Sequence, residues 1–196
     1  MAALVCFDAE GHWQDTLVCD HLIGRSLAQA GVAWGRWPVR EVDGSDAAAV
    51  RAAYGQEIEE IAALPGRFEV QSADRVRVAP GQPGWPALRA QFLTEHTHAD
   101  AEIRFFLEGA GLFYVRSGEG YVGLLCEAGD WVALPAGTTH AFDAGTEPDF
   151  DALRLFADPQ GWVAQPTGHA LPAALPLFDD FVERLLEMTG HEAEVG

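Results

Sequence analysis

Two histidines separated by a single residue, His96 and His98, are the side chains of this sequence best placed to share a metal ion. On an extended strand both would point to the same face, because side chains alternate with a period of two. Glu102 follows them after a tight three-residue segment, and His140 follows a turn that contains proline and glycine. Three imidazoles and one carboxylate would suit a divalent transition metal such as iron, nickel, manganese or zinc, and no thiolate joins them to favour a softer ion.

The spacing around these residues resembles the two-part pattern of the cupin superfamily. The first part, His-x-His-x3-Glu-x6-Gly, begins at His96, and the second, Gly-x5-Pro-x-Gly-x2-His, ends at His140. Two positions depart from the pattern, because Ala90 stands where a glycine is usual and Ala144 replaces the usual asparagine. The ligand positions are intact. The resemblance therefore implies a metal site in a mainly β protein, a cupin-type antiparallel β-barrel (jelly roll) with flanking N-terminal helices and a C-terminal helix.

The rest of the chain must supply the elements that hold such a site. We expect a single domain over residues 1–196, since no repeat, low-complexity tract or long linker divides the chain. It would consist of an N-terminal helical elaboration over about 1–66, a barrel over about 67–165 and a C-terminal helix over about 176–189. Short apolar runs in the second region predict strands, and helical spacing in the third predicts an amphipathic helix.

Individual elements follow from the apolar pattern and the turn residues. Glycine-rich turns separate the short runs, which is typical of an antiparallel sandwich or barrel. Ser45 or Asp46 is the expected cap of the second helix. The predicted helices cover 15–30, 46–64 and 177–188, and the predicted strands cover 4–7, 32–39, 76–78, 103–107, 112–116, 121–126, 131–134, 140–143 and 152–157. A glutamate cluster, Glu57, Glu59 and Glu60, is expected to face solvent.

Charge and composition restrict the partners. The formal net charge is −18 and the pI is about 4.5, which would repel nucleic acid and anionic membrane surfaces. We therefore expect no nucleic-acid or membrane partner, and a small polar substrate or a basic partner fits better. All 12 basic residues are arginines. This excludes Schiff-base chemistry on a lysine, a P-loop lysine and a lysine general base.

The cysteines and the N-terminus predict a cytoplasmic location. Cys6, Cys19 and Cys126 are odd in number, far apart and without a Cys-x-x-Cys pair, so they fit reduced thiols better than a disulfide framework. Asp8 brings a charge too early for a secretory signal peptide, and no apolar run approaches the roughly 18 residues of a membrane span. We expect a cytoplasmic monomer.

Longer runs of sequence are similar to the acireductone dioxygenase family of the methionine salvage pathway. The run Glu-x-Arg-Phe-Phe-x-Glu-Gly, which begins at Glu102, is far more selective than the general cupin pattern. The similar segments extend over most of the chain and include 95–113, 134–143, 154–156 and 161–162. Carried over position by position, the resemblance makes His96, His98, Glu102 and His140 the ligands of one Fe(II) or Ni(II) per chain.

The resemblance also implies the reaction. Such a dioxygenase would act with O2 on the anion of 1,2-dihydroxy-3-keto-5-methylthiopentene, an acireductone. The iron form would give formate and 4-methylthio-2-oxobutanoate, and the nickel form would give formate, carbon monoxide and 3-methylthiopropanoate. The ligand set accommodates either metal, so the sequence does not choose between the two outcomes.

Two arginines and a group of aromatic residues are the candidates for contact with such a substrate. Arg104 shares strand parity with Glu102, and Arg154 interrupts an apolar strand. Both are expected as catalytic residues that stabilise an anionic enediolate, and pairing with structural carboxylates is the alternative for each. Most aromatic residues must fill the core, and those expected to wall the substrate pocket are Phe92, Phe105, Phe142 and Trp162.

Histidines outside the motif have weaker cases. His12 and His21 are expected at the surface or at element ends, and His169 could reach the barrel mouth but is better explained by a surface position. The sequence identifies no general base for removal of the substrate proton.

Two other functions fit the same cupin pattern. One is a different metal-dependent reaction, such as oxidative cleavage of another diketone or an isomerisation, and turnover without oxygen would favour the isomerisation. The other is a pirin-like regulator or ligand-binding cupin whose metal is structural. Failure of the metal-loaded protein to consume oxygen with an acireductone would favour that second alternative.

Overall fold

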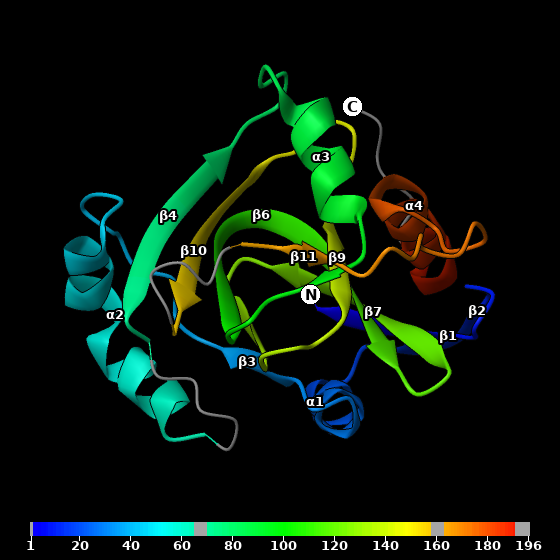
Figure 1. The fold of residues 1–196 in the computed structure, drawn as a ribbon, viewed down its shortest axis with the longest axis horizontal. Coiled ribbons are helices and arrows are strands. Elements are labelled where there is room, and N and C mark those ends of the chain that lie inside the picture. The colour runs from blue at the N-terminus through cyan, green and yellow to red at the C-terminus, as the bar shows by residue number, and fades with distance from the viewer. Residues whose placement is uncertain (1, 65–69, 158–162, 191–196) are drawn as a thin grey trace.

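A computed structural model describes residues 2–64, 70–157 and 163–190 of the chain. Antiparallel strands form the centre of the molecule and helices lie outside them (Figure 1). This arrangement confirms the mainly β, antiparallel jelly roll that the sequence predicts. Within the described residues the path of paired strands stays open instead of closing into a complete ring.

The long strand β6 (Glu102–Ser117) belongs to both sheets of the barrel. Its first half pairs with β8 (Asp130–Leu134) and β10 (Phe150–Phe156), and its second half pairs with β7 (Gly120–Glu127) and β9 (His140–Asp143). The halves meet at Gly109, whose φ is +69° and where a Cβ would lie 1.8 Å from the carbonyl oxygen of Asp149. Only glycine fits there, and one bent strand replaces the two separate strands predicted over 103–107 and 112–116.

Shorter strands extend both sheets. The first sheet adds β4 (Ser72–Val78) beside β10 and β3 (Ala33–Arg36) beside β8. The second sheet adds β5 (His96–Thr97) and β11 (Gln165–Pro166) beyond β9, and β1 (Ala3–Phe7) and β2 (Trp13–Leu17) beyond β7. β5, which bears His96 and is followed directly by His98, therefore lies between β9 and β11.

Four helices surround the described strands, namely α1 (Asp20–Gln29), α2 (Ala47–Ala62), α3 (Trp85–Leu93) and α4 (Phe178–Thr189). The predicted cap of α2 is confirmed, because the Asp46 carboxylate accepts a hydrogen bond from the backbone N of Ala49 at 2.9 Å. The predicted C-terminal helix is confirmed as α4, whose buried Phe181 packs among residues of β1 and β7. No helix in the described part of the chain is both long and apolar enough to cross a membrane.

The N-terminal region is less helical than predicted. The helix expected over 15–30 begins only at Asp20, because Trp13–Leu17 forms strand β2 instead. A tight turn after β1 makes this hairpin, in which the Asp8 carboxylate accepts a hydrogen bond from the backbone N of His12 at 2.8 Å. Pairing with β1 outweighs the helical spacing of two or three apolar residues, and β1, β2 and β3 become part of the sheets.

Two further expectations differ from the structure. No helix was predicted between residues 64 and 177, yet α3 occupies Trp85–Leu93. Trp85, Leu88 and Phe92 have the spacing of one helix face, which is the signal that could have revealed it. Glu57 was expected to face solvent with Glu59 and Glu60, but its side chain is buried and forms an ion pair with Arg40.

Candidate active site

The four candidate ligands come together from neighbouring segments. His96 on β5 lies directly opposite His140 on β9, and His98 follows β5 at once. The ligand atoms of the three histidines all lie within 4.8 Å of one another, and all three side chains are buried. Glu102 opens β6 and turns its carboxylate to the same place, with Oε2 at 3.0 Å from Nε2 of His98 and 3.4 Å from Nε2 of His140.

Backbone carbonyl groups orient the three imidazole rings. Each Nδ1 lies near a carbonyl oxygen, that of His96 at 2.6 Å from Thr94, that of His98 at 3.3 Å from Val163 and that of His140 at 2.8 Å from Thr138. A ring whose Nδ1–H donates to a carbonyl keeps the lone pair on Nε2, which is the form that binds a metal ion. Three Nε2 atoms are therefore available on the side where Glu102 lies.

The electrostatics of the cluster keep Glu102 ionised. Burial acts to raise the pKa of the Glu102 carboxyl, but the charge of Arg104 and hydrogen bonds from His140 and His98 outweigh it and hold the pKa well below its usual range. Burial, together with the nearby His140, lowers the pKa of His96 to about 4. An ionised carboxylate and a neutral imidazole are the forms in which these groups bind a metal ion.

At His98, a proton and a metal ion would compete for the same ring nitrogen. Burial acts to lower the pKa of His98, but the hydrogen bond to Glu102 raises it. The same Nε2 and carboxylate oxygen that share this proton are the atoms that a metal ion would bind. The buried donor set of three imidazoles and one carboxylate thus fits a divalent transition metal ion.

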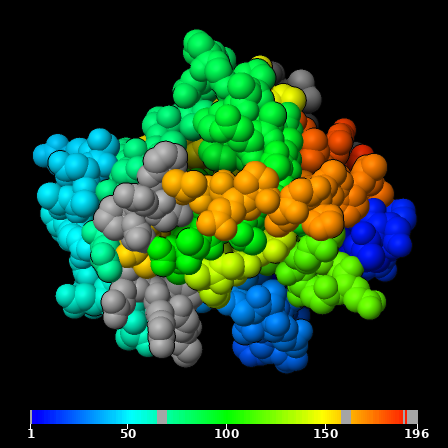
Figure 2. Space-filling view, in the orientation of Figure 1, coloured from blue at the N-terminus to red at the C-terminus, as the bar shows by residue number. Residues whose placement is uncertain are grey.

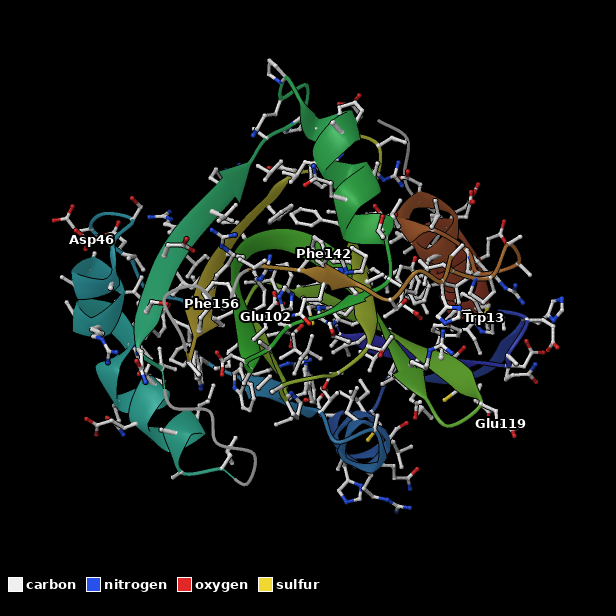
Figure 3. All side chains as sticks on the ribbon, viewed as in Figure 1. Trp13, Asp46, Glu102, Glu119, Phe142 and Phe156 are labelled. Atoms are coloured by element: carbon white, nitrogen blue, oxygen red, sulfur yellow. The ribbon has the colours of Figure 1, made fainter. Side chains whose placement is uncertain are left out.

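A cavity of about 560 Å³ adjoins the histidines. Its walls are mainly apolar and aromatic, and include Val76, Leu88, Phe92, Phe113, Phe142, Phe156 and Val163. Figure 3 shows Glu102, Phe142 and Phe156 toward the middle of the barrel, while Trp13 and Glu119 lie at its periphery. In the space-filling view the segment that contains β11 crosses the front of the molecule below α3 (Figure 2). The candidate ligands therefore form part of the wall of a largely apolar chamber.

Comparison with known proteins decides the family. The family model described as the ARD/ARD' family matches residues 39–164, which include all four candidate ligands. This chain belongs to the ARD/ARD' family. Membership makes it an enzyme, a metal-binding dioxygenase.

Relatives of this ARD/ARD' family member share most of its length. The acireductone dioxygenase of Hahella chejuensis is 40% identical over 162 residues, covering 82% of this chain and 86% of that protein. Acireductone dioxygenase 1 of Nocardia farcinica is 42% identical over 167 residues, covering 82% and 87%. The structure resembles that of acireductone dioxygenase from Bacillus anthracis with a cadmium ion in its active centre, with a TM-score of 0.71 over 84% of this chain and 98% of that one. At 22% identity, that likeness shows the shared fold.

Of the two arginines predicted from the sequence, Arg104 is the one beside the ligands in this ARD/ARD' family member. Its side chain is buried, and Nη2 donates to Oε1 of Glu102 at 2.5 Å. The guanidinium carbon lies 5.5 Å from the centre of the Phe142 ring, and Nε has no hydrogen-bond partner among the described residues. A buried donor without a partner at the cavity wall is available to a ligand.

Arg154 also lines the cavity but is already paired. It donates to both carboxylate oxygens of Asp74, from Nε at 2.8 Å and from Nη2 at 2.5 Å. The alternative reading of this arginine, a pair with a carboxylate, therefore holds in the structure. Such a bidentate pair fixes the guanidinium plane while leaving the group at the cavity wall.

The aromatic predictions have mixed outcomes. Phe92 on α3 and Phe142 on β9 line the cavity as expected. The prediction for Phe105 was wrong, because this residue points to the opposite face of β6 and packs with Trp37 and Tyr54, ring centres 5.1 and 5.0 Å away. Residue parity explains this, since the even positions Glu102 and Arg104 face the cavity and the odd positions Ile103 and Phe105 face the other way.

Some predicted positions carry no further information about the cavity. Trp162 lies outside the described residues. His12, His21 and His169 are exposed, in agreement with the surface positions expected for them.

Among the aromatic residues that line the cavity, two were not predicted from the sequence. Phe113 lies opposite Phe142 across the pairing of β6 with β9, and Phe156 lies opposite Glu102 across the pairing of β10 with β6. Their positions depend on strand register, for which the sequence alone gives no direct signal. Parity with Arg154 was the one hint that Phe156 faces the cavity.

Proposed function

We propose that this chain binds one Fe(II) or Ni(II) ion through His96, His98, Glu102 and His140 and uses it to oxidise an acireductone with O2. The observation that carries the proposal is the buried cluster of three histidines, two of which have Nε2 beside the Glu102 carboxylate, on the wall of a largely aromatic cavity. The names of the relatives support the choice of acireductone as substrate. When bound, the ion would supply Lewis acidity, a template for a chelating substrate and a route for electrons to dioxygen.

Arg104 would stabilise the anionic oxygens of the enediolate. Its Nη2 is engaged with Glu102, whereas the buried Nε remains free to donate. In a cavity with apolar walls, a fixed guanidinium stabilises negative charge more strongly than it does in water. We therefore assign Arg104 the catalytic role that the sequence suggested.

Arg154 would act at greater distance from the ligands. Asp74 holds its guanidinium against the Phe156 ring, whose centre is 5.8 Å from the guanidinium carbon. In this position it adds positive potential to the wall of the cavity and helps to attract and orient an anion. Because Arg154 is partly exposed to solvent whereas Arg104 is buried beside the candidate ligands, we expect a smaller contribution from Arg154 than from Arg104.

The aromatic walls would take the methylthioalkyl tail of the substrate. Phe92 and Phe142 lie edge to face, with ring centres 5.7 Å apart, on two different elements that meet beside the ligands. Flat apolar surfaces of this kind exclude water and bind a thioether chain by burial and sulfur–aromatic contact. The tail would thus be held while the enediolate end faces Arg104.

Oxygen uptake with defined metal content tests this function. Metal-free protein is loaded with Fe(II) or Ni(II), mixed with the acireductone, and followed with an oxygen electrode and product analysis. We expect uptake with both metals, the iron form giving formate and 4-methylthio-2-oxobutanoate and the nickel form also giving carbon monoxide. Absence of uptake with both metals would contradict the proposal and favour a binding protein.

The remaining expectations concern the state of the protein in the cell. We infer a cytoplasmic, monomeric protein with a single domain and without nucleic-acid or membrane partners. Three free cysteines and the net charge of −18 support this inference. Participation of β1, β2 and β3 in the barrel sheets supports the single domain.

A further inference from the structure

The strand that bears His96 and leads directly into His98 is short. β5 contains only His96 and Thr97, and it pairs with β9 at a single position. On its other side it pairs with β11, which also has two residues. Such short pairings provide few backbone hydrogen bonds to hold the segment of His96 and His98. A side-chain contact must therefore help to hold this segment in place.

Glu95, directly before β5, provides that contact. Its side chain is 1% exposed, and its neighbour His96 is turned toward the metal-binding cluster. The carboxylate accepts hydrogen bonds from Arg116 Nη2 at 2.8 Å and Nε at 3.2 Å, Tyr121 Oη at 3.1 Å and Thr167 Oγ1 at 2.6 Å. The backbone carbonyl of Glu95 also accepts from the backbone N of Thr167 at 3.0 Å. One buried side chain therefore joins β5 to β6, β7 and the segment after β11.

Arg116 extends the connection to the other ligand-bearing strand. Its guanidinium binds the carboxylate of the residue before His96. Its backbone N donates to the carbonyl oxygen of Thr139, the residue before His140, at 3.0 Å. A single residue of β6 thus holds the chain immediately before two of the metal-binding histidines.

We propose that Glu95 is a positioning residue of the metal site, which sets the distance between the His96–His98 segment and His140 through Arg116, Tyr121 and Thr167. It contacts no substrate and acts only through the placement of the two imidazoles. Partners that orient metal ligands typically change metal affinity or activity by about 10- to 100-fold when they are removed. The proposal rests on the metal site of the proposed function, but not on its substrate.

Cobalt(II) titration tests the proposal without any acireductone. The d–d absorption of bound Co(II) reports both the dissociation constant and the geometry of the ligands. We compare the wild type with Glu95→Gln, which keeps the side-chain volume but removes the charge that Arg116 neutralises. We expect the Co(II) dissociation constant to rise about tenfold, and the d–d bands of the saturated protein to shift.

Asp151→Asn is the matched control. Asp151 is a buried carboxylate that also pairs with an arginine, Arg75, through Nε at 3.0 Å and Nη2 at 2.7 Å, and it is not among the residues that line the cavity. The substitution makes the same chemical change at a comparable ion pair. We expect it to lower the melting temperature while leaving the Co(II) constant and spectrum at their wild-type values.

Each outcome bears on the proposal. If Glu95→Gln does not fold, Thr167→Val removes one hydrogen bond from the same carboxylate and should change the constant and the bands in the same direction, by less. Wild-type values in both Glu95→Gln and Thr167→Val would overturn the positioning role, as would an equal loss of affinity in Asp151→Asn. If wild-type protein binds no Co(II), the metal site itself fails, and the proposed function fails with it.

Discussion

Arg104 and Arg154 lie directly opposite each other in the pairing of β6 with β10. Two neighbouring positive charges at a cavity wall repel each other, and each is accordingly paired with its own carboxylate, Glu102 and Asp74. The two pairs differ in depth, because Arg104 is buried and Arg154 is partly exposed. An anionic substrate bound beside the candidate ligands would meet Arg104 before Arg154.

Glu102 and Arg104, two positions apart on the same face of β6, are predicted to have different roles. Glu102→Gln should weaken metal retention, because the amide removes a charge from the donor set. Arg104→Ala should leave metal content near normal but lower kcat/KM about 100- to 1000-fold, as expected when one donor to a developing oxyanion is lost. Metal analysis of both proteins beside an oxygen-electrode assay separates the two effects. Equal metal loss in both variants would refute the division.

Phe142 on β9 lines the cavity, whereas Phe105 on β6 packs in a core outside it, so substitutions at the two phenylalanines should have different outcomes. Phe142→Leu should raise KM, because the ring lines the cavity. Phe105→Leu should leave KM unchanged and lower the free energy of unfolding by about 1 kcal/mol, because Phe105 packs with Trp37 and Tyr54 in a separate core. Steady-state kinetics and urea unfolding of both variants measure these quantities. A raised KM in Phe105→Leu would show that this core is not separate from the cavity.

The ion pair between the buried Glu57 and the exposed Arg40 predicts a pH dependence of stability. The hydrogen bond from Arg40 lowers the pKa of Glu57, so its contribution to stability is present above the usual glutamate pKa and is lost as the pH falls through the folded-state value. Glu57→Gln should therefore be less stable than the wild type at pH 7, with a difference that shrinks on acidification. Urea unfolding of metal-free protein between pH 7 and pH 3 measures it. A difference that stays constant over this range would mean that the charge of Glu57 contributes nothing.

The cysteines differ in expected reactivity. Cys19 is exposed, whereas Cys126 is buried, and burial raises the pKa of the Cys126 thiol well above its usual value. Cys19 should react with a thiol reagent in the native protein, and Cys126 only after unfolding. Mass spectrometry of peptides from native and urea-treated samples distinguishes the two. Rapid labelling of native Cys126 would indicate that this part of the sheet opens readily.

Local patterns were enough to single out the candidate metal ligands that the structure brings together. His96 and His98 share a face whenever their segment is extended, and Glu102 and Arg104 share one for the same reason. Asp46 was likewise found as a helix cap because capping is a local interaction. These predictions needed no knowledge of which strands are neighbours.

Contacts that depend on which strands are neighbours could not be predicted from local sequence patterns. Phe113 and Phe156 reach the cavity through strand register. By contrast, the error at Phe105 was avoidable, because its parity is opposite to that of Glu102 and Arg104. The contacts of Glu95 come from residues 21, 26 and 72 positions away, at Arg116, Tyr121 and Thr167. No spacing rule connects such residues, since the fold alone brings them together.

The location of a bound ion tests most directly whether the three histidines and Glu102 form the metal site. Crystals of the nickel-loaded protein, measured at the nickel absorption edge, give an anomalous difference map that shows where the metal lies. We predict one peak per chain, bonded to Nε2 of His96, His98 and His140 and to the carboxylate of Glu102. A peak confined to another group, such as the exposed cluster of Asp8, Glu10 and His12, or no peak at the three buried histidines, would contradict it.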